Sequence, residues 1–246
     1  MCLIATHPMA SYSRMDQEVD VQIEPSLSSE TASFDTERMR RSRPSPERSI
    51  LLYWVLSIAF GLLLVGDWLT SWNVGRTLGQ PGLLTFLLFT FALSQVLYIL
   101  VARHDGRPFA ADATLIFAIG NGICETLAFA SVFRLGINIG STLVGLFAPT
   151  AASVSGFILG LIFFSIYGGL IHGLFWLRVL PPHLDNAPRS RAIRKIRPLA
   201  EVGLVLGWSL CMWLNNDIWT VVILHVLVDI GLMLRVRPRI FAYGLI

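Results

Sequence analysis

Four side chains in apolar stretches of this sequence carry groups that can exchange protons or bind metal ions. Glu125 lies in GNGICETLAF, His172 in YGGLIHGLFW, and both His225 and Asp229 in ILHVLVDIGL. Inside a membrane-spanning segment such groups cost at least about 2.5 kcal/mol each, so they are rare and tend to mark function. Asp67, in GDWLTSW, falls near the end of its apolar stretch, beside two tryptophans, and we expect it to be structural.

The spacing of these residues predicts which of them share a helix face. Asn121 precedes Glu125 by four residues, and His225 precedes Asp229 by four, so each pair lies on one face of a helix. Asp229 could orient the imidazole of His225 or contribute a polar group of its own. Gly120 and Gly122 are small enough to let another helix approach closely beside Glu125.

Together, Glu125, His172, His225 and Asp229 have the composition of a metal-binding or water-activating site. Imidazole nitrogen and carboxylate oxygen are the usual ligands of catalytic zinc, which leaves one position for water. Glutamate can act as a general base on that water, and the exclusion of bulk water strengthens electrostatic effects. We therefore predict a candidate site for a zinc-like divalent metal at Glu125, His172 and His225. The alternative is packing: each group would only form a hydrogen bond or ion pair between helices.

The elements that must position these groups are transmembrane helices. Of the 246 residues, 54% are hydrophobic and 14% are charged, whereas soluble domains have about 25% charged residues. Continuous apolar runs of about 20 residues match a hydrocarbon core of about 30 Å, and their lack of alternation favours helices over a barrel. We predict an all-α, polytopic transmembrane helix bundle of about six spans, at about 50–69, 82–102, 112–133, 152–178, 198–214 and 217–235.

The regions around the spans complete the predicted organisation. In this prediction, residues 1–48 form a disordered polar and basic tail, and residues 49–110 form two N-terminal helices. Residues 111–236 form the core that holds the ionisable groups, and residues 237–246 form a short C-terminal tail. The stretch 137–150 is apolar but short, so we expect a half-helix or a re-entrant piece. Pro181-Pro182 should close the fourth span, and the loop at about 180–197 is long enough to lie along the membrane surface.

Basic residues predict the orientation of the chain. They cluster before the first span, after the second, after the fourth and after the sixth, and an even number of spans puts all four clusters on one side. By the positive-inside rule we expect both termini to be cytoplasmic, in a bacterial inner membrane as first choice and a chloroplast membrane as second. Because topology explains the arginines, the net charge of +3 gives no argument for nucleic acid.

The remaining motifs exclude several kinds of chemistry. Cys2, Cys124 and Cys211 form no CxxC pair, so neither a disulfide framework nor a zinc ribbon is supported. The sequence has no GxxxxGK[ST] phosphate loop, no GxSxG elbow and no HExxH. The partners that we expect are the lipid bilayer and a membrane-associated peptide or protein substrate.

The order of the ionisable groups resembles the CPBP family of intramembrane proteases, also called the CAAX protease and bacteriocin-processing, or Abi, family. Its motifs read EExxxR, FxxxH and HxxxN/D. Residues 125–130 (ETLAFA) keep the leading glutamate, but Thr126 and Ala130 stand where the family has glutamate and arginine. Residues 168–172 (GGLIH) keep the histidine, with Gly168 at the aromatic position and Tyr167 adjacent. Residues 225–229 (HVLVD) match fully.

The resemblance covers residues 112–235 and implies an α-helical active site that opens toward the membrane. It implies that Glu125 and His172 activate the hydrolytic water, often with a metal, while His225 and Asp229 polarise the scissile carbonyl or hold the metal. Substrates of the family are membrane-associated peptides, such as prenylated tails or bacteriocin precursors. The charge pair missing at Thr126 and Ala130 leaves open a divergent enzyme or an inactive relative that binds without cutting.

Two other classes of function remain open for the same residues. One is a small transporter or proton relay, which the lack of an internal repeat and the small number of spans disfavour. The other is a catalytically silent scaffold or chaperone with the same fold. Convergence of Glu125, His172 and His225 would favour the enzyme, whereas a Glu125 that points away from both histidines would exclude it.

Overall fold

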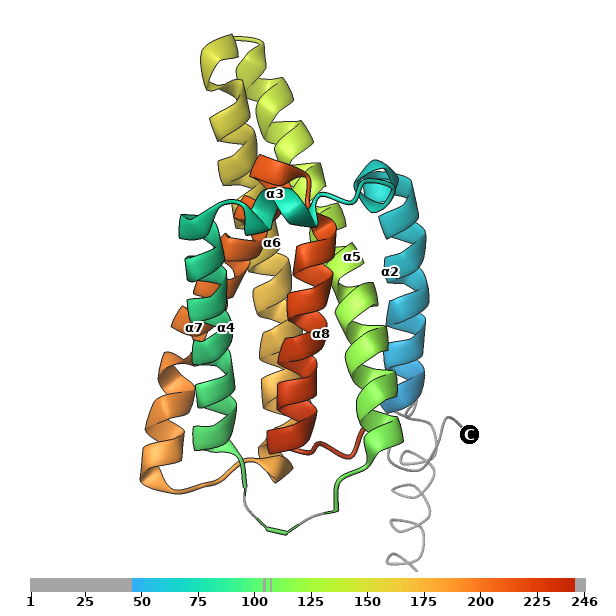
Figure 1. The fold of residues 1–246 in the computed structure, drawn as a ribbon, viewed down its shortest axis with the longest axis vertical. Helices are drawn as coiled ribbons and strands as arrows, with labels where there is room; N and C mark the ends of the chain where they lie inside the picture. Colours follow the sequence, from blue (N-terminus) through green and yellow to red (C-terminus); the bar gives the residue numbers. More distant parts are fainter. Residues whose placement is uncertain (1–45, 104, 107, 242–246) are drawn as a thin grey trace, which may run out of the picture. The chain divides into compact units, whose positions relative to one another are not determined.

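The computed structural model describes residues 46–241 except 104 and 107 (Figure 1). Over this part of the chain the regular structure is helical, apart from one isolated bridge between Ala102 and Leu184. Six helical segments are long and apolar enough to cross a membrane, which confirms the predicted all-α bundle of about six spans. The predicted N-terminal tail up to residue 45, with Cys2, and the last part of the C-terminal tail lie outside the described residues.

Seven α-helices and three short helical turns make up the described part. The α-helices are α2 (Pro46–Leu69), α3 (Val74–Leu78), α4 (Pro81–Val101), α5 (Ala111–Gly145), α6 (Ala152–Leu174), α7 (Pro188–Asn215) and α8 (Ile218–Arg235). The turns are η1 (Pro149–Ala151), η2 (Phe175–Val179) and η3 (Pro181–His183). Helices α4 and α7 begin with a proline. At this position a backbone N–H has no partner within the helix, so its absence costs no hydrogen bond. Asp217 caps α8 by accepting a hydrogen bond from the Thr220 amide.

The stretch 137–150 is not a separate half-helix or re-entrant piece, so that prediction was wrong. Helix α5 continues through it to Gly145 and is 35 residues long. A Cβ built on Gly136 would lie 2.6 Å from the Cα of Gly160, so α5 and α6 pack backbone against backbone at this point. The close packing and the unbroken backbone hydrogen bonding together favour one long helix over two pieces.

The loop predicted at about 180–197 is also shorter than expected. Pro181-Pro182 does follow the end of the fourth span, which passes through η2 into η3. Helix α7, however, already begins at Pro188, and Pro198 lies inside it rather than near its start. Arg197 and Glu201 form an ion pair one helical turn apart across this region, and we attribute the continuous helix partly to that pair.

Helices α5 and α8 are the most enclosed spans, and their packing positions the site. In the most apolar stretch of each helix, 67% of the residues of α5 and 61% of those of α8 are buried, against 22% for the span that contains α6. A Cβ on Gly122 of α5 would lie 2.8 Å from the backbone nitrogen of Val226 on α8. This confirms the close approach predicted at Gly122. Helices α5 and α8 lie side by side (Figure 1), and Glu125 and His225 meet between them.

Candidate active site

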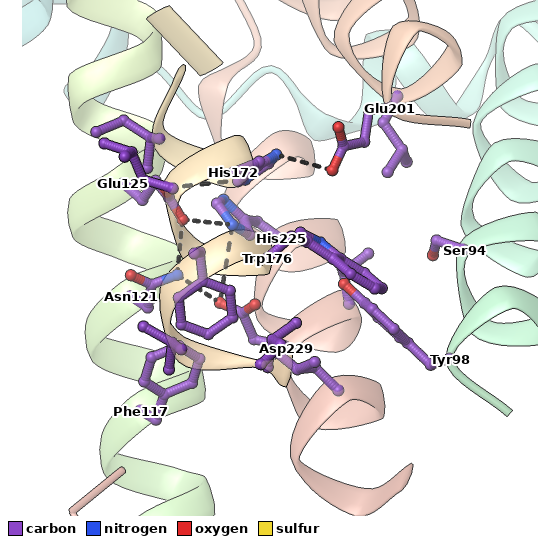
Figure 2. A pocket seen from close by; sticks show the side chains of 18 of the residues that line it. Ser94, Tyr98, Phe117, Asn121, Glu125, His172, Trp176, Glu201, His225 and Asp229 are labelled. Carbon is purple, nitrogen blue, oxygen red and sulfur yellow. Dashed lines mark hydrogen bonds and ion pairs between the residues drawn. The ribbon is translucent and has the colours of Figure 1, made fainter. Parts of the chain in front are cut away.

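Three of the predicted site residues, each from a different helix, converge at one point (Figure 2). Glu125 Oε2 lies 3.3 Å from His225 Nε2, and Glu125 Oε1 lies 3.8 Å from His172 Nε2. One ligand atom from each residue can be chosen so that all three lie within 4.8 Å of one another. Glu125 and His225 are buried, and His172 is half-buried. Glu125 therefore faces both histidines.

Asp229 belongs to the same cluster, and Asn121 joins it to Glu125. Asp229 Oδ2 lies 3.7 Å from His225 Nε2, the nitrogen that also faces Glu125. Asp229 therefore contributes a polar group of its own to the site, and does not orient the ring from behind. The Asn121 amide donates to Glu125 Oε2 at 2.7 Å and to Asp229 Oδ2 at 2.9 Å. Trp54 donates from its indole N–H to Asn121 Oδ1 at 3.3 Å, which fixes the amide orientation.

Thr126 contacts the ring nitrogen of His225 that faces away from Glu125. Its Oγ1 lies 2.6 Å from the Gly122 carbonyl oxygen and 3.0 Å from His225 Nδ1. A hydroxyl has one hydrogen, so Thr126 either donates it to the carbonyl and accepts from Nδ1–H or donates it to Nδ1. In the first arrangement the Nε2 lone pair of His225 is available to a metal ion; in the second, Nε2–H can donate to Glu125 Oε2. Sequence reasoning treated Thr126 only as a departure from a motif and missed this contact.

Aromatic rings hold both imidazoles in place. Phe129 stacks on His225 with an interplanar angle of 4° and presents its edge to His172 at 87°. Trp208 packs on His225 with 4.9 Å between ring centroids. Such ring pairs restrict rotation and exclude water, so the histidines are oriented before any ligand arrives.

Glu201 is a site residue that sequence reasoning missed. Its Oε1 lies 3.6 Å from His172 Nδ1 and 3.0 Å from Arg197 Nη1. Both side chains of the ion pair are largely buried. A signal was present in the sequence, since Glu201 is an acidic residue inside the span predicted at 198–214 and follows an arginine by four residues.

The cluster forms part of the wall of a cavity of about 520 Å³. Ser94 and Tyr98 of α4 stand across from Glu125 and Asn121 (Figure 2). The rest of the wall is mainly apolar and aromatic, with Ile50, Phe117, Leu174, Phe175, Trp176 and Leu232 among its residues. The cavity can therefore accommodate an apolar ligand next to the polar cluster.

The charges around the cavity fit a divalent cation. Glu125, Asp229 and Glu201 bring three carboxylates, and Arg197 is the one arginine of the lining that is not exposed. With ionised carboxylates and neutral histidines, the formal balance is three negative charges against one positive. Burial of uncompensated charge is costly. Either one divalent ion at the Glu125, His172 and His225 donor set or protons on both histidines would neutralise the difference.

No family model, curated protein or solved structure matches this chain. The chemistry therefore has to be derived from the geometry. A buried carboxylate faces two imidazoles, a second carboxylate lies beside them, and an amide donor connects the two acids. That arrangement can hold a divalent metal and take a proton from water.

Asp67 has the structural role predicted for it. Both carboxylate oxygens of Asp67 accept hydrogen bonds from Arg134 at 2.7 Å, and the Asp67 side chain is largely exposed. The pair joins α2 to α5 away from the cavity, which makes it structural. Cys124 and Cys211 are buried and form no disulfide.

Proposed function

We propose that this protein is a membrane-embedded endopeptidase of the CPBP type, which hydrolyses membrane-associated peptides or protein tails. The observation that carries the proposal is the convergence of Glu125, His172 and His225 on three helices. A buried carboxylate between two oriented imidazoles is the arrangement that water activation requires.

In the proposed mechanism, Glu125 is the general base. Its Oε2 is held by Asn121, while Oε1 faces His172 and is placed to take a proton from water. His225 and Asp229 lie on the other side of this carboxylate. They would polarise the scissile carbonyl when they carry a proton on the side that faces the cavity, or help to hold the metal when they do not. A divalent metal held by Glu125, His172 and His225 would supply Lewis-acid activation of the water or the carbonyl.

The cavity supports a membrane-associated substrate. It lies within six membrane-spanning segments, and apart from the cluster its wall is mainly apolar and aromatic. Its lining includes Ser49 near the start of α2, Tyr98 near the end of α4 and Leu180 after α6. The positive-inside rule assigns these ends to the cytoplasmic side, so we propose that substrates arrive from that side.

A proton relay is the second candidate function, and one observation favours it. The titratable groups Glu201, His172, Glu125, His225 and Asp229 form a chain in which each neighbouring pair is 3.3–3.8 Å apart. A relay would give proton flux in liposomes without any peptide cleavage. A catalytically silent relative would give neither.

Cleavage of a panel of quenched, membrane-anchored peptides by the purified protein tests the proposal. The wild type should cut at least one peptide, and Glu125→Gln should not, because the amide cannot accept a proton. Asp67→Asn is the matched control, since it alters an acidic residue that pairs with an arginine away from the cavity. Equal cleavage by wild type and Glu125→Gln would contradict the proposal, as would proton flux without cleavage.

A further inference from the structure

One carboxylate of the cavity has no part in the proposed chemistry and stands behind a histidine that does. Glu201 Oε1 lies 3.6 Å from Nδ1 of His172, whereas Nε2 of the same ring lies 3.8 Å from Glu125 Oε1. The imidazole of His172 therefore stands between two acids that come from α7 and α5 (Figure 2). The nitrogen that faces the cluster is Nε2.

Glu201 is itself held in place by its neighbours. Arg197 Nη1 lies 3.0 Å from Glu201 Oε1, and the Arg197 guanidinium lies over the ring of Trp176 at 4.7 Å from its centroid. Trp176 follows His172 by four residues. The His172–Trp176 face of α6 and η2 thus packs against the Arg197–Glu201 face of α7. Because the ion pair is mostly buried, water screens it only weakly.

We infer that Glu201 is a positioning residue for His172 and that Arg197 fixes Glu201 in this role. In the positioned state, His172 carries its proton on Nδ1, directed at Glu201, and leaves the Nε2 lone pair directed at Glu125 and His225. Carboxylates behind metal-binding histidines set the tautomer and the ring orientation in this way. The contact of 3.6 Å is slightly longer than a hydrogen bond, and such contacts shorten when a site binds its ligand.

This inference gives the site a carboxylate–guanidinium pair from a different helix. The CPBP-like motif at 125–130 has Thr126 and Ala130 where a glutamate and an arginine would support the leading glutamate. Arg197 and Glu201 supply the same two chemical groups from α7, next to His172. The part of the inference that concerns metal rests on the proposed function, whereas the tautomer of His172 does not.

The tautomer can be measured directly on the full-length protein. Two-bond ¹H–¹⁵N correlation spectra of ¹⁵N-histidine-labelled protein in nanodiscs, with His172→Asn for assignment, show which ring nitrogen carries the proton. We expect the Nδ1–H form in the wild type and in Asp67→Asn, and a mixture or the Nε2–H form in Glu201→Met. An Nε2–H form in the wild type would overturn the inference, as would a spectrum that Glu201→Met leaves unchanged. The wild-type spectrum decides even if the variant fails to fold.

Titration with cobalt(II) alone gives a second readout that separates the two claims. Loss of a carboxylate behind a metal-binding histidine weakens metal binding by about 10–100-fold, so Glu201→Gln should do the same and Glu201→Asp should restore part of the affinity. Equal affinity in wild type and Glu201→Gln would overturn the inference and leave the protease proposal standing. No cobalt binding by the wild type, together with the Glu201-dependent Nδ1–H tautomer, would support the inference and count against the metal in the proposed function.

Discussion

Thr126 Oγ1 lies 3.0 Å from Nδ1 of His225 and 2.6 Å from the carbonyl oxygen of Gly122. The threonine thus joins the backbone of α5 to the ring nitrogen of His225 that faces away from Glu125. It stands at the position where the motif that the sequence resembles has a second glutamate, and it still reaches the site.

The first prediction tests this contact with an isosteric change. Thr126→Val keeps the shape but removes the hydroxyl, so Nδ1 of the buried His225 loses its hydrogen-bond partner. We expect a loss of about 1–3 kcal/mol in the free energy of unfolding and a fall in peptide cleavage of about 10–100-fold. Thr126→Ser should retain most of both. Equal cleavage by the valine and serine variants would show that the contact has no role in orienting His225.

The second prediction concerns the approach of α5 to α8. A Cβ at Gly122 would lie 2.5 Å from Val226 Cγ2 and 2.8 Å from its backbone nitrogen, so Gly122→Ala must push the two helices apart. We expect destabilisation of about 1–3 kcal/mol and reduced cleavage, because Glu125 and His225 separate. Gly169→Ala is the matched control, since nothing lies within 4 Å of its added Cβ. Similar results for both variants in thermal unfolding and cleavage assays would contradict the account.

The third prediction concerns the amide that joins the two buried acids. Asn121→Leu removes the donor to Glu125 and to Asp229 and the acceptor for Trp54. We expect a cost of at least about 1–3 kcal/mol, because buried charged groups lose their partners. Trp54→Phe removes only one neutral hydrogen bond, so the loss of that bond should lower the free energy of unfolding by less than Asn121→Leu does. Chemical denaturation of the two variants compares them, and an Asn121→Leu protein as stable as the wild type would refute the assignment.

The fourth prediction is metal dependence. Purified protein should bind a zinc-like ion, because the described residues include one group of three suitable ligands, Glu125, His172 and His225. Treatment with a chelator should abolish cleavage and added Zn²⁺ should restore it, while His172→Ala should bind metal more weakly than wild type. Elemental analysis measures the bound metal in wild type and His172→Ala, and activity assays measure cleavage after chelation and after addition of Zn²⁺. Cleavage that survives complete chelation would point to a metal-free glutamate–histidine mechanism.

The fold and the centre of the site could be predicted from the sequence. Long apolar runs require helices in a membrane, whatever their tertiary contacts. Glu125, His172 and His225 stood out because ionisable groups are costly in such runs. The spacing of Asn121 from Glu125 was enough to predict a shared face, and the structure confirms it with a hydrogen bond.

The parts that could not be predicted depend on contacts between helices. Thr126 is an ordinary helix residue until its position opposite His225 is known. Glu201 is an acidic residue inside a predicted span, but its proximity to His172 depends on how α7 packs on α6. The stretch 137–150 looked too short for a span, and the structure shows that its residues up to Gly145 extend α5, packed through glycines against α6.

The central claim is that Glu125, between His172 and His225, activates water to cleave a peptide bond. The most direct test is to digest a substrate peptide in H₂¹⁸O with wild type and with Glu125→Gln, and to weigh the products by mass spectrometry. We predict one ¹⁸O atom in the new C-terminal carboxylate with the wild type and no product with Glu125→Gln. An uncut peptide with well-folded wild type, across a broad panel and with Zn²⁺ present, would contradict the claim. So would labelled product of equal yield from Glu125→Gln.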